Sequence, residues 1–363
     1  MIKVMTIFGT RPEAIKMAPL VLEMGKRKGD FEPITVVTGQ HREMLKQVLD
    51  VFEITPDYDL NIMSTNQTLA SITTKILDSL SPVIEKTTPD IILVHGDTST
   101  TFAASLAAFF HKIPIGHVEA GLRTWDKYSP FPEEMNRQLT DVLADVYFAP
   151  TEDTKRNLVA ENKDESKIVV TGNTAIDALK ITVSKESRNV KHEKRNILLT
   201  MHRRENQGQN MRNVFNAVNR ITKAYGDVEF TYPVHLSPVV QSLAKEYFTN
   251  NDKVKLVKPM DVVDFHAAIN NSYFVMSDSG GVQEEAPALD KPVLVLRDTT
   301  ERPEGVEAGT LKLVGTNEAD VFEAMKQLLD NSGMYKSMAN AVNPYGDGFA
   351  SSRILDYIAQ KMG

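Results

Sequence analysis

The chain has 363 residues, a length that suggests two domains. Its apolar content of 42% and charged content of 25% are ordinary for a soluble globular protein. The net charge of −7 argues against a general nucleic-acid or anionic-membrane surface, and the lack of cysteine excludes disulfides and thiolate chemistry. The apolar runs at 1–8 and 102–110 are too short for a signal peptide or a membrane span. We therefore expect a cytoplasmic protein with no nucleic-acid or membrane partner.

The first half of the chain alternates apolar β-type runs with helical patterns. Pro12 stands where a first helical residue is expected, directly after a Gly-Thr-Arg turn. Leu122–Phe131 is predicted to be a loop. The predicted strands are 3–8, 34–38, 90–94, 113–118 and 146–149, and the predicted helices are 12–24, 40–52, 69–80, 98–110 and 132–143. This alternation is typical of a doubly wound parallel sheet.

A break near Lys163–Asn173 precedes a second alternating region. Strands are predicted at 197–201, 228–233, 254–257, 273–276, 293–296 and 311–314, with helices that include 211–225, 319–329 and 351–361. We expect an α/β fold of two Rossmann-like parallel-sheet domains that face a cleft. The expected domains are 1–168 and 172–345, with a C-terminal helix at 348–363 that packs back on the first.

Polar side chains follow several predicted strands directly: Arg11, Asp97, Glu119, His202 and Ser279. Ligands of open parallel sheets bind beyond the carboxyl ends of the strands, so this placement favours an enzyme. Each residue also has a simpler interpretation. Asp97 could cap the helix that follows it, and Glu119 could form a structural salt bridge.

Two pairs of charged residues remain ambiguous on sequence grounds. Glu133 and Glu134 lie in a predicted first helical turn, where the macrodipole alone favours acids. Arg203 and Arg204 are either a solvated pair or ligands of a diphosphate.

The segment Ser277–Glu285 reads as a strand, a Ser/Gly turn and a helix start. Free N–H groups at Ser279, Gly280 and Gly281 would form an anion site. Glu285, about one turn further on, is suited to accept hydrogen bonds from a ribose diol. The alternative is an ordinary strand–turn–helix junction.

Several common signatures are missing from the sequence. The glycines show no Gly-x-Gly-x-x-Gly, P-loop or Gly-x-Ser-x-Gly spacing, and the histidines show no His-Glu-x-x-His spacing. We therefore expect no nicotinamide cofactor and no dedicated metal site. A phosphate-anchoring turn, cations and carboxylates remain, which suggests acid–base work on a nucleotide-linked substrate.

Longer motifs make the interpretation specific. They are Gly9–Lys16, His95–Thr98, His117–Thr124, Tyr128–Glu134, His202–Asn206, Ser277–Pro287, Arg297–Glu304 and Asn343–Gly348. In this order, over nearly the whole chain, they resemble the non-hydrolysing UDP-N-acetylglucosamine 2-epimerases of bacteria. The resemblance implies a glycosyltransferase B-type fold, usually a homodimer, and interconversion of UDP-GlcNAc and UDP-ManNAc without cofactor or metal. The product would supply ManNAc for cell-surface polysaccharides.

The resemblance also implies roles for individual residues. Those expected around UDP, chiefly in the second domain, are Arg11, Lys16, His202, Phe265, Ser279, Gly280, Gly281, Glu285 and Arg302. Asp97, Glu119 and Glu133 match the carboxylates that face the sugar, and His202 is grouped with them as catalytic. Some members bind a second UDP-GlcNAc as an allosteric activator, and here Gln40, Glu43, Glu133, Arg203 and His235 fall at such positions. Glu43 and Asn66 depart from the expected Gln and Arg.

The implied chemistry begins with loss of UDP from C1, which makes the C2 proton acidic and yields 2-acetamidoglucal. Return of a proton to the opposite face and re-addition of UDP complete the epimerisation. Several carboxylates with different pKa values are suited to remove the C2 proton and to return one. The competing interpretations are a retaining glycosyltransferase of the same fold, a hydrolysing relative that releases free ManNAc, and a UDP-sugar sensor without turnover.

Overall fold

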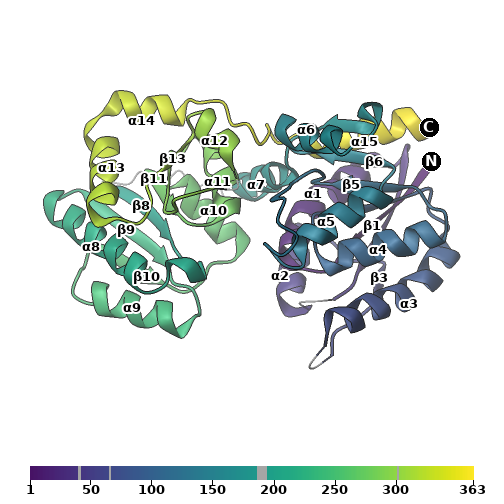
Figure 1. The fold of residues 1–363 in the computed structure, drawn as a ribbon, viewed down its shortest axis with the longest axis horizontal. Coiled ribbons are helices and arrows are strands. Elements are labelled where there is room, and N and C mark those ends of the chain that lie inside the picture. The colour runs from purple at the N-terminus through teal and green to yellow at the C-terminus, as the bar shows by residue number, and fades with distance from the viewer. Residues whose placement is uncertain (40–41, 65–66, 186–193, 301) are drawn as a thin grey trace. The chain divides into compact units, whose positions relative to one another are not determined.

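The computed structural model describes residues 1–39, 42–64, 67–185, 194–300 and 302–363. The chain divides into two compact units (Figure 1). Unit 1 comprises Met1–Ala178 and Tyr345–Gly363, and unit 2 comprises Leu179–Pro344. Among the described residues, no helix is both long and apolar enough to cross a membrane.

Unit 1 is built on a parallel sheet that has seven strands in the described residues, in the order β3-β2-β1-β4-β5-β6-β7. The strands are β1 (Ile2–Phe8), β2 (Phe31–Val37), β3 (Tyr58–Asp59), β4 (Ile91–His95), β5 (Ile115–Val118), β6 (Val146–Ala149) and β7 (Ile168–Val170). Apart from Lys3, the residues of β1, β4, β5 and β6 are buried, as expected of strands covered on both faces.

The helices of unit 1 connect these strands. They are α1 (Arg11–Lys26), α2 (Arg42–Phe52), α3 (Leu69–Thr87), α4 (Ser99–Phe110), α5 (Glu133–Leu143), α6 (Glu152–Ala160), the start of α7 (Thr174–Lys185) and α15 (Ala350–Met362), with a 3₁₀ turn at Glu165–Lys167. The last helix, α15, packs against α1, where Asp356 forms an ion pair with Arg27. The chain therefore returns to unit 1 after completing unit 2.

Three parts of the sequence interpretation of unit 1 differ from the structure. The break predicted at Lys163–Asn173 contains the edge strand β7, which pairs with β6 from Tyr147↔Ile168 to Ala149↔Val170. The division between the units falls at Ala178–Leu179, inside α7, rather than between residues 168 and 172. The short edge strand β3 was also missed, because two paired residues leave no periodic pattern.

Unit 2 is built on a second parallel sheet, with six strands in the described residues in the order β10-β9-β8-β11-β12-β13. The strands are β8 (Arg195–Thr200), β9 (Val228–Pro233), β10 (Val254–Val257), β11 (Phe274–Ser277), β12 (Val293–Val295) and β13 (Leu311–Leu313). The helices are α8 (Gln209–Ala224), α9 (Pro238–Phe248), α10 (Val262–Asn270), α11 (Gly280–Glu285), α12 (Pro303–Glu307), α13 (Glu318–Asp330) and α14 (Ser332–Ala339), with 3₁₀ turns at Arg204–Asn206 and Pro287–Leu289.

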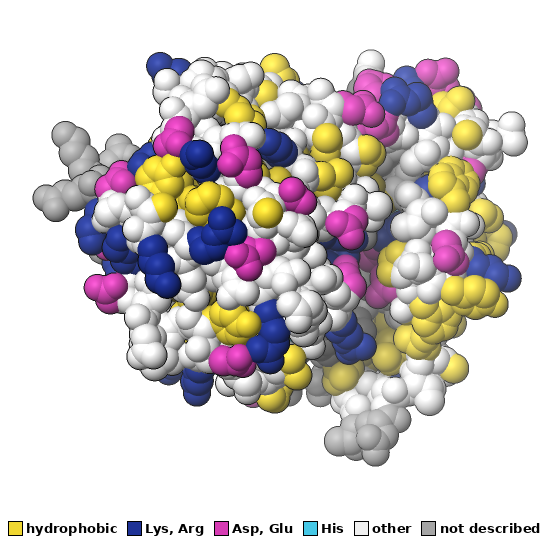
Figure 2. All heavy atoms as spheres, turned by 60° about the vertical axis from the view of Figure 1, so that its left-hand side comes forward, with side chains coloured by type: hydrophobic (Ala, Val, Ile, Leu, Met, Phe, Trp, Pro, Cys, Tyr) yellow, Lys and Arg dark blue, Asp and Glu magenta, His cyan; other side chains and the backbone are white. Residues whose placement is uncertain are grey.

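Each sheet carries an apolar core of its own. In unit 2, Phe215 packs edge-on against Tyr232 and tilted against Phe248, at ring-centroid distances of 5.7 and 4.7 Å. On the surface seen in Figure 2, acidic and basic side chains are interspersed. The sheets fix the positions of the turns that follow their strands, and Asp97, Glu119, His202 and Ser279 lie in these turns.

Candidate active site

Two of the predicted acids of unit 1 leave neighbouring strands at the same edge of the sheet. His95 at the end of β4 is in register with Val118 at the end of β5. Asp97 and Glu119 follow these two residues closely, so the parallel pairing brings both acids to one edge.

The turn between β1 and α1 is held by a buried acid that sequence reasoning did not single out. Glu13 accepts hydrogen bonds from the backbone of Gly9 and Thr10 at 3.0 and 2.7 Å, and Thr10 caps α1 in return. The other oxygen of Glu13 accepts from Thr98 at 2.7 Å. Burial raises the pKa of Glu13, while these donors lower it. Glu13 connects the turn to the start of α4 and so fixes the position of Arg11, the first residue of α1.

Glu119 combines an unusual backbone conformation with a buried and paired side chain. Its φ of 66° lies in the left-handed region, which a non-glycine residue occupies at a cost and which is common at active sites. The side chain is buried, and its Oε2 forms an ion pair with Lys16 and accepts from Asn173 at 2.8 Å. The salt-bridge interpretation of Glu119 therefore describes a real contact, which the side chain makes from a left-handed backbone.

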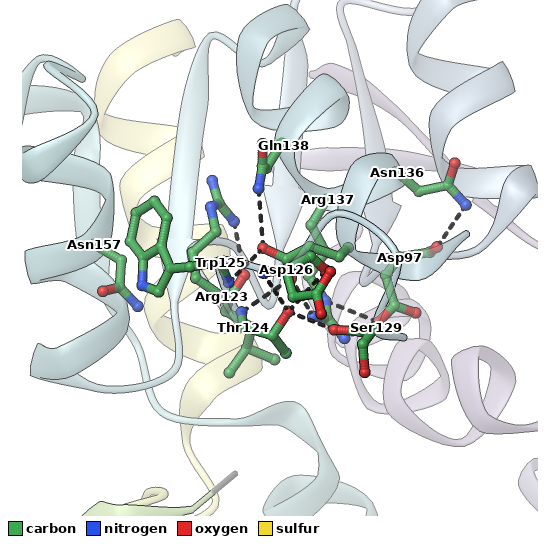
Figure 3. Close-up of polar contacts among 12 residues, drawn as sticks. Asp97, Arg123, Thr124, Trp125, Asp126, Ser129, Asn136, Arg137, Gln138 and Asn157 are labelled. Atoms are coloured by element: carbon green, nitrogen blue, oxygen red, sulfur yellow. Dashed lines mark hydrogen bonds and ion pairs between the residues drawn. The ribbon is translucent and has the colours of Figure 1, made fainter. Parts of the chain in front are cut away.

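Asp97 does not cap the helix that follows it. The N-cap of α4 is Thr98, whose side chain accepts from Thr101 at 3.1 Å. The carboxylate of Asp97 instead accepts two hydrogen bonds from Arg137 on α5, at 2.9 and 2.7 Å, and remains about a quarter exposed. Asn136 donates to the backbone carbonyl of Asp97 at 2.9 Å, as Figure 3 shows. Helix α5 therefore positions Asp97.

The two neighbouring acids at the start of α5 differ. Glu134 is fully buried and accepts from the backbone of Thr124 and Trp125, at 3.0 and 3.2 Å, and from Arg137 at 2.9 Å. It thereby holds the loop that carries the exposed ring of Trp125 (Figure 3). Glu133 is the first residue of α5 and is partly exposed. Of the pair, Glu134 holds the loop at Thr124 and Trp125, whereas Glu133 is partly exposed at the start of α5.

A network of ion pairs, most of it buried, lies next to this edge of the sheet and links β5 to α5. His117 on β5 contacts Asp141 at 2.6 Å and the carbonyl of Gly96 at 2.8 Å. Asp141 also accepts from Arg123, which in turn binds Glu161 at 2.7 Å. Burial opposes ionisation of Asp141, but His117 and Arg123 outweigh it, and the net pKa of Asp141 is lowered. The network fixes Gly96, the residue before Asp97.

In unit 2, Asp278 holds the loops that follow two of the strands; it lies inside the Ser-Asp-Ser-Gly-Gly segment, Ser277–Gly281. The residue is fully buried, and its Oδ2 accepts from the backbone of His202 and Arg203 and from the side chain of Asn206, at 3.0, 2.9 and 3.0 Å. Strands β8 and β11 are neighbours, and Ser277 and Thr200 are in register. Asp278 thus connects the loop after β8 to the turn after β11.

His202 lies at this junction. Its Nδ1 is 3.4 Å from Oδ1 of Asp278, and its ring stacks on His235 at a centroid distance of 5.5 Å. Burial lowers the pKa of His202, and His235 and Arg203 act in the same direction, whereas Asp278 raises it. The side chain is 42% exposed, so it can reach a ligand.

The predicted anion turn has the expected form, but its helix is short. Ser279 is the N-cap of α11, which has six residues, and Gly280 and Gly281 form its first turn. The first N–H groups of a helix have no partner within it, whereas the dipole of so short a helix is small. Any anion binding here therefore rests on the individual backbone donors.

Glu285 and Phe265 lie close to this turn. The carboxylate of Glu285 is 3.7 Å from Nε2 of His266, whose Nδ1 contacts Thr182 at 2.6 Å. An added Cβ at Gly281 would lie 3.8 Å from Oε1 of Glu285, which places that acid beside the turn. Phe265 on α10 is partly buried and packs against the apolar cluster that includes Val282 and Ala286.

Arg302 is anchored to α11. Its Nε forms an ion pair with the buried Glu284, and its backbone N–H donates to Thr300 at 3.0 Å. Thr300 in turn donates to Gln283 at 2.5 Å. These contacts hold Arg302 against α11, the helix that begins with the Ser/Gly turn.

The predicted activator residues are distributed over both units. Gln40 and the divergent Asn66 lie outside the described residues. Glu43 is exposed on α2, and Glu133 begins α5. Arg203 and His235 lie in unit 2 beside His202, in the loop after β8 and as its stacking partner.

Sequence reasoning missed several residues that organise these loops: Glu13, His95, Asn136, Arg137, Asn173, His266, Asp278 and Glu284. Glu13 could have been found, because Thr10-Arg11-Pro12-Glu13 has the spacing of a capping box. The others depend on contacts between residues far apart in the chain. Among the described residues, no three His, Asp or Glu side chains group as ligands for a metal ion.

Two consecutive parallel-sheet α/β units, with their polar residues at the carboxyl ends of the strands, define a protein of the glycosyltransferase B-type fold. The family model for UDP-N-acetylglucosamine 2-epimerase matches residues 23–359, and the chain belongs to this family of isomerases.

Relatives and solved structures agree with this assignment. A UDP-N-acetylglucosamine 2-epimerase of Bacillus subtilis is 58% identical over 98% of this chain and 94% of its own. The Escherichia coli K12 protein of the same name is 49% identical over 98% and 97%. The Neisseria meningitidis enzyme, solved bound to UDP-GlcNAc, superposes with a TM-score of 0.90 at 49% identity, covering 99% of this chain and 100% of that one. The Methanocaldococcus jannaschii enzyme, solved with UDP-GlcNAc and UDP, gives 0.79 at 34% identity, with the same coverages.

Proposed function

We propose that the chain interconverts UDP-GlcNAc and UDP-ManNAc by eliminating UDP to 2-acetamidoglucal and adding it back. Family membership supports the epimerase activity. The observation that carries the proposed mechanism is the pair of acids at one sheet edge, Asp97 and Glu119. One is partly exposed beside Arg137, and the other is buried beside Lys16 on a left-handed backbone.

The uridine and diphosphate of the substrate are assigned to unit 2. Ser279, Gly280 and Gly281 supply backbone donors for phosphate, and Glu285 accepts from the ribose diol. Two solved relatives contain UDP-GlcNAc, or UDP-GlcNAc with UDP, which supports a ligand of this chemistry. His202 and Arg302 add positive or hydrogen-bonding groups in the same unit.

The sugar is assigned to the acids of unit 1. C2 is not adjacent to a carbonyl, so a base cannot remove its proton directly. Departure of UDP gives C1 oxocarbenium character, and the C2 proton then becomes acidic. One carboxylate takes this proton as the C2–H electron pair forms the C1–C2 double bond. Arg11 and Lys16 would stabilise the charge that develops on the leaving diphosphate.

Return to the sugar nucleotide requires a proton on the opposite face of C2 and attack of UDP on C1. Two acids in different environments suit this, because one can hold a proton while the other is ionised. The carboxylate of Asp97 accepts from Arg137, whereas that of Glu119 is held by Lys16 and Asn173. Glu133, partly exposed on α5, is the third candidate.

A proton-NMR time course with pure protein and UDP-GlcNAc in water tests the proposed function. The expected result is a steady mixture of UDP-GlcNAc and UDP-ManNAc without free sugar. Accumulation of free ManNAc would indicate the hydrolysing reaction, and an unchanged sugar would indicate a sensor. Transfer of GlcNAc to an added acceptor would favour the glycosyltransferase.

Finer features of the function belong to the same proposal. The enzyme would work as a cytoplasmic homodimer and supply ManNAc for surface polysaccharides. UDP-GlcNAc would act as an activator through Arg203, His235, Glu133 and the region of Gln40 and Glu43. The stacked pair His202–His235 supports this, because it would connect the activator residues to a proposed catalytic one.

A further inference from the structure

His95 is a buried histidine that the proposed function does not yet use. It is the last residue of β4 and is only 3% exposed. Among the described residues, neither of its ring nitrogens has a hydrogen-bond partner. Its Nε2 lies 3.7 Å from Oε2 of Glu119. Buried polar groups without a partner are costly and rare, so an unsatisfied imidazole beside a proposed catalytic acid calls for a role.

Two other groups contact that oxygen, and both of them are hydrogen-bond donors. Lys16 forms an ion pair with Oε2 of Glu119, and the amide nitrogen of Asn173 donates to it at 2.8 Å. An ammonium and an amide NH₂ can only donate. Both therefore favour the ionised form of Glu119 and cannot accept a hydrogen bond from its protonated form. A neutral imidazole can accept through one nitrogen.

The surroundings of His95 keep its ring neutral. Burial lowers the pKa of His95 to about 4, and the charge of Lys16 on α1 and of His117 on β5 acts in the same direction. Glu119 and Asp97, which follow β5 and β4, oppose this shift but do not overcome it. At neutral pH the ring therefore offers one acceptor nitrogen.

We propose that His95 is a positioning residue for Glu119, and that its Nε2 accepts a hydrogen bond from the Glu119 carboxyl while that group holds the proton taken from C2. This rests on the proposed function. The hydrogen bond requires the 3.7 Å contact to shorten, by rotation of a side chain, to the usual range of about 2.7–3.2 Å. The proton stays on Glu119 until it exchanges with solvent or returns to the sugar, so no proton passes to the ring.

Two substitutions of similar shape separate this role from simple packing. His95→Gln supplies an amide oxygen as acceptor, whereas His95→Met fills similar space without a strong acceptor. The measurement is the rate of deuterium uptake at C2 of UDP-GlcNAc in D₂O across the pH range, with UDP affinity by calorimetry. Thr140→Val on α5 is the matched control, because the Thr140 hydroxyl is also buried without a partner among the described residues.

We expect His95→Met to lower kcat for exchange at least about 10-fold, with UDP affinity unchanged and the low-pH limb displaced to lower pH. His95→Gln should retain most of the wild-type rate, and Thr140→Val all of it. A wild-type rate in His95→Met would overturn the inference. Equal loss in both variants with weakened UDP binding would do so too, since it indicates a packing role. If the wild-type enzyme itself incorporates no deuterium at C2, this result contradicts the proposed function, on which the role of His95 rests.

Discussion

Replacing Asp278 by Asn should loosen the loop that carries His202. The carboxylate accepts from two backbone N–H groups and from Asn206 through Oδ2, while Oδ1 faces Nδ1 of His202 at 3.4 Å. An amide oxygen can keep the first set of contacts. Its NH₂ group then faces the imidazole, which must change tautomer or leave a buried donor unpaired.

The structure sets the size of this effect. One unpaired buried polar group costs about 1–3 kcal/mol. In a unit of this size, each kcal/mol lowers the unfolding temperature by about 2–4 °C. Loss of the carboxylate also removes the interaction that raises the pKa of His202, while burial, His235 and Arg203 continue to lower it. If His202 binds the diphosphate, UDP affinity should fall about 5- to 150-fold, and more steeply at low pH.

Calorimetric titration with UDP and a thermal unfolding scan measure both quantities. Asp252→Asn is the control, because it removes an exposed acid of the same unit and should change neither. If Asp278→Asn binds UDP and unfolds like the wild-type protein, the buried carboxylate does not hold this loop, and our reasoning about the β8–β11 junction is wrong.

Three further predictions concern the other parts of the site. Glu285→Ala should weaken UDP affinity by about 1–3 kcal/mol, because a ribose diol would lose its acceptor; unchanged affinity by calorimetry would remove Glu285 from the site. Asp97→Asn should slow C2 exchange roughly 10²-fold or more while UDP still binds, since Arg137 keeps its contact with Glu134; exchange at the wild-type rate would exclude Asp97 as a proton-transfer group. His95 should make the fold acid-sensitive, because burial lowers its pKa from 6.5 to about 4 in the folded protein. As the pH falls, the His95 ring of the unfolded chain is therefore protonated before that of the folded protein. The free energy of unfolding should fall by about 3 kcal/mol between pH 6.5 and pH 4. Urea titrations of His95→Gln should lack that part of the loss; an identical pH dependence in the variant would show that the shift is absent.

The alternation of apolar runs and helical patterns was sufficient to predict the doubly wound fold. Runs such as Val146–Ala149, Val228–Pro233 and Val254–Val257 are strands over those residues. Val146–Ala149 is buried throughout and leaves this signal because both of its faces must be apolar, whereas Val228–Pro233 alternates buried and half-buried residues. The edge strand Ile168–Val170 has only three residues and stands beside turn-forming ones, so the sequence pattern indicated a break there.

The polar residues after the strands were predicted where the structure has them, but their partners were not. Asp97 could be located from its sequence neighbours, whereas its contact with Arg137 joins residues 40 positions apart. Glu119 gave no sequence sign of its left-handed backbone. Asp278 was not singled out between its two serines, because its partners near residue 203 lie more than 70 positions away. Such contacts depend on strand order, which local patterns do not specify.

Cleavage of the C2–H bond is the central claim about the chemistry, and isotope uptake tests it most directly. The wild-type protein should be incubated with UDP-GlcNAc in D₂O and followed by proton NMR. We predict that both UDP-GlcNAc and UDP-ManNAc acquire deuterium at C2 and at no other ring carbon. Interconversion of the two sugars with C2 still fully protonated would contradict the mechanism.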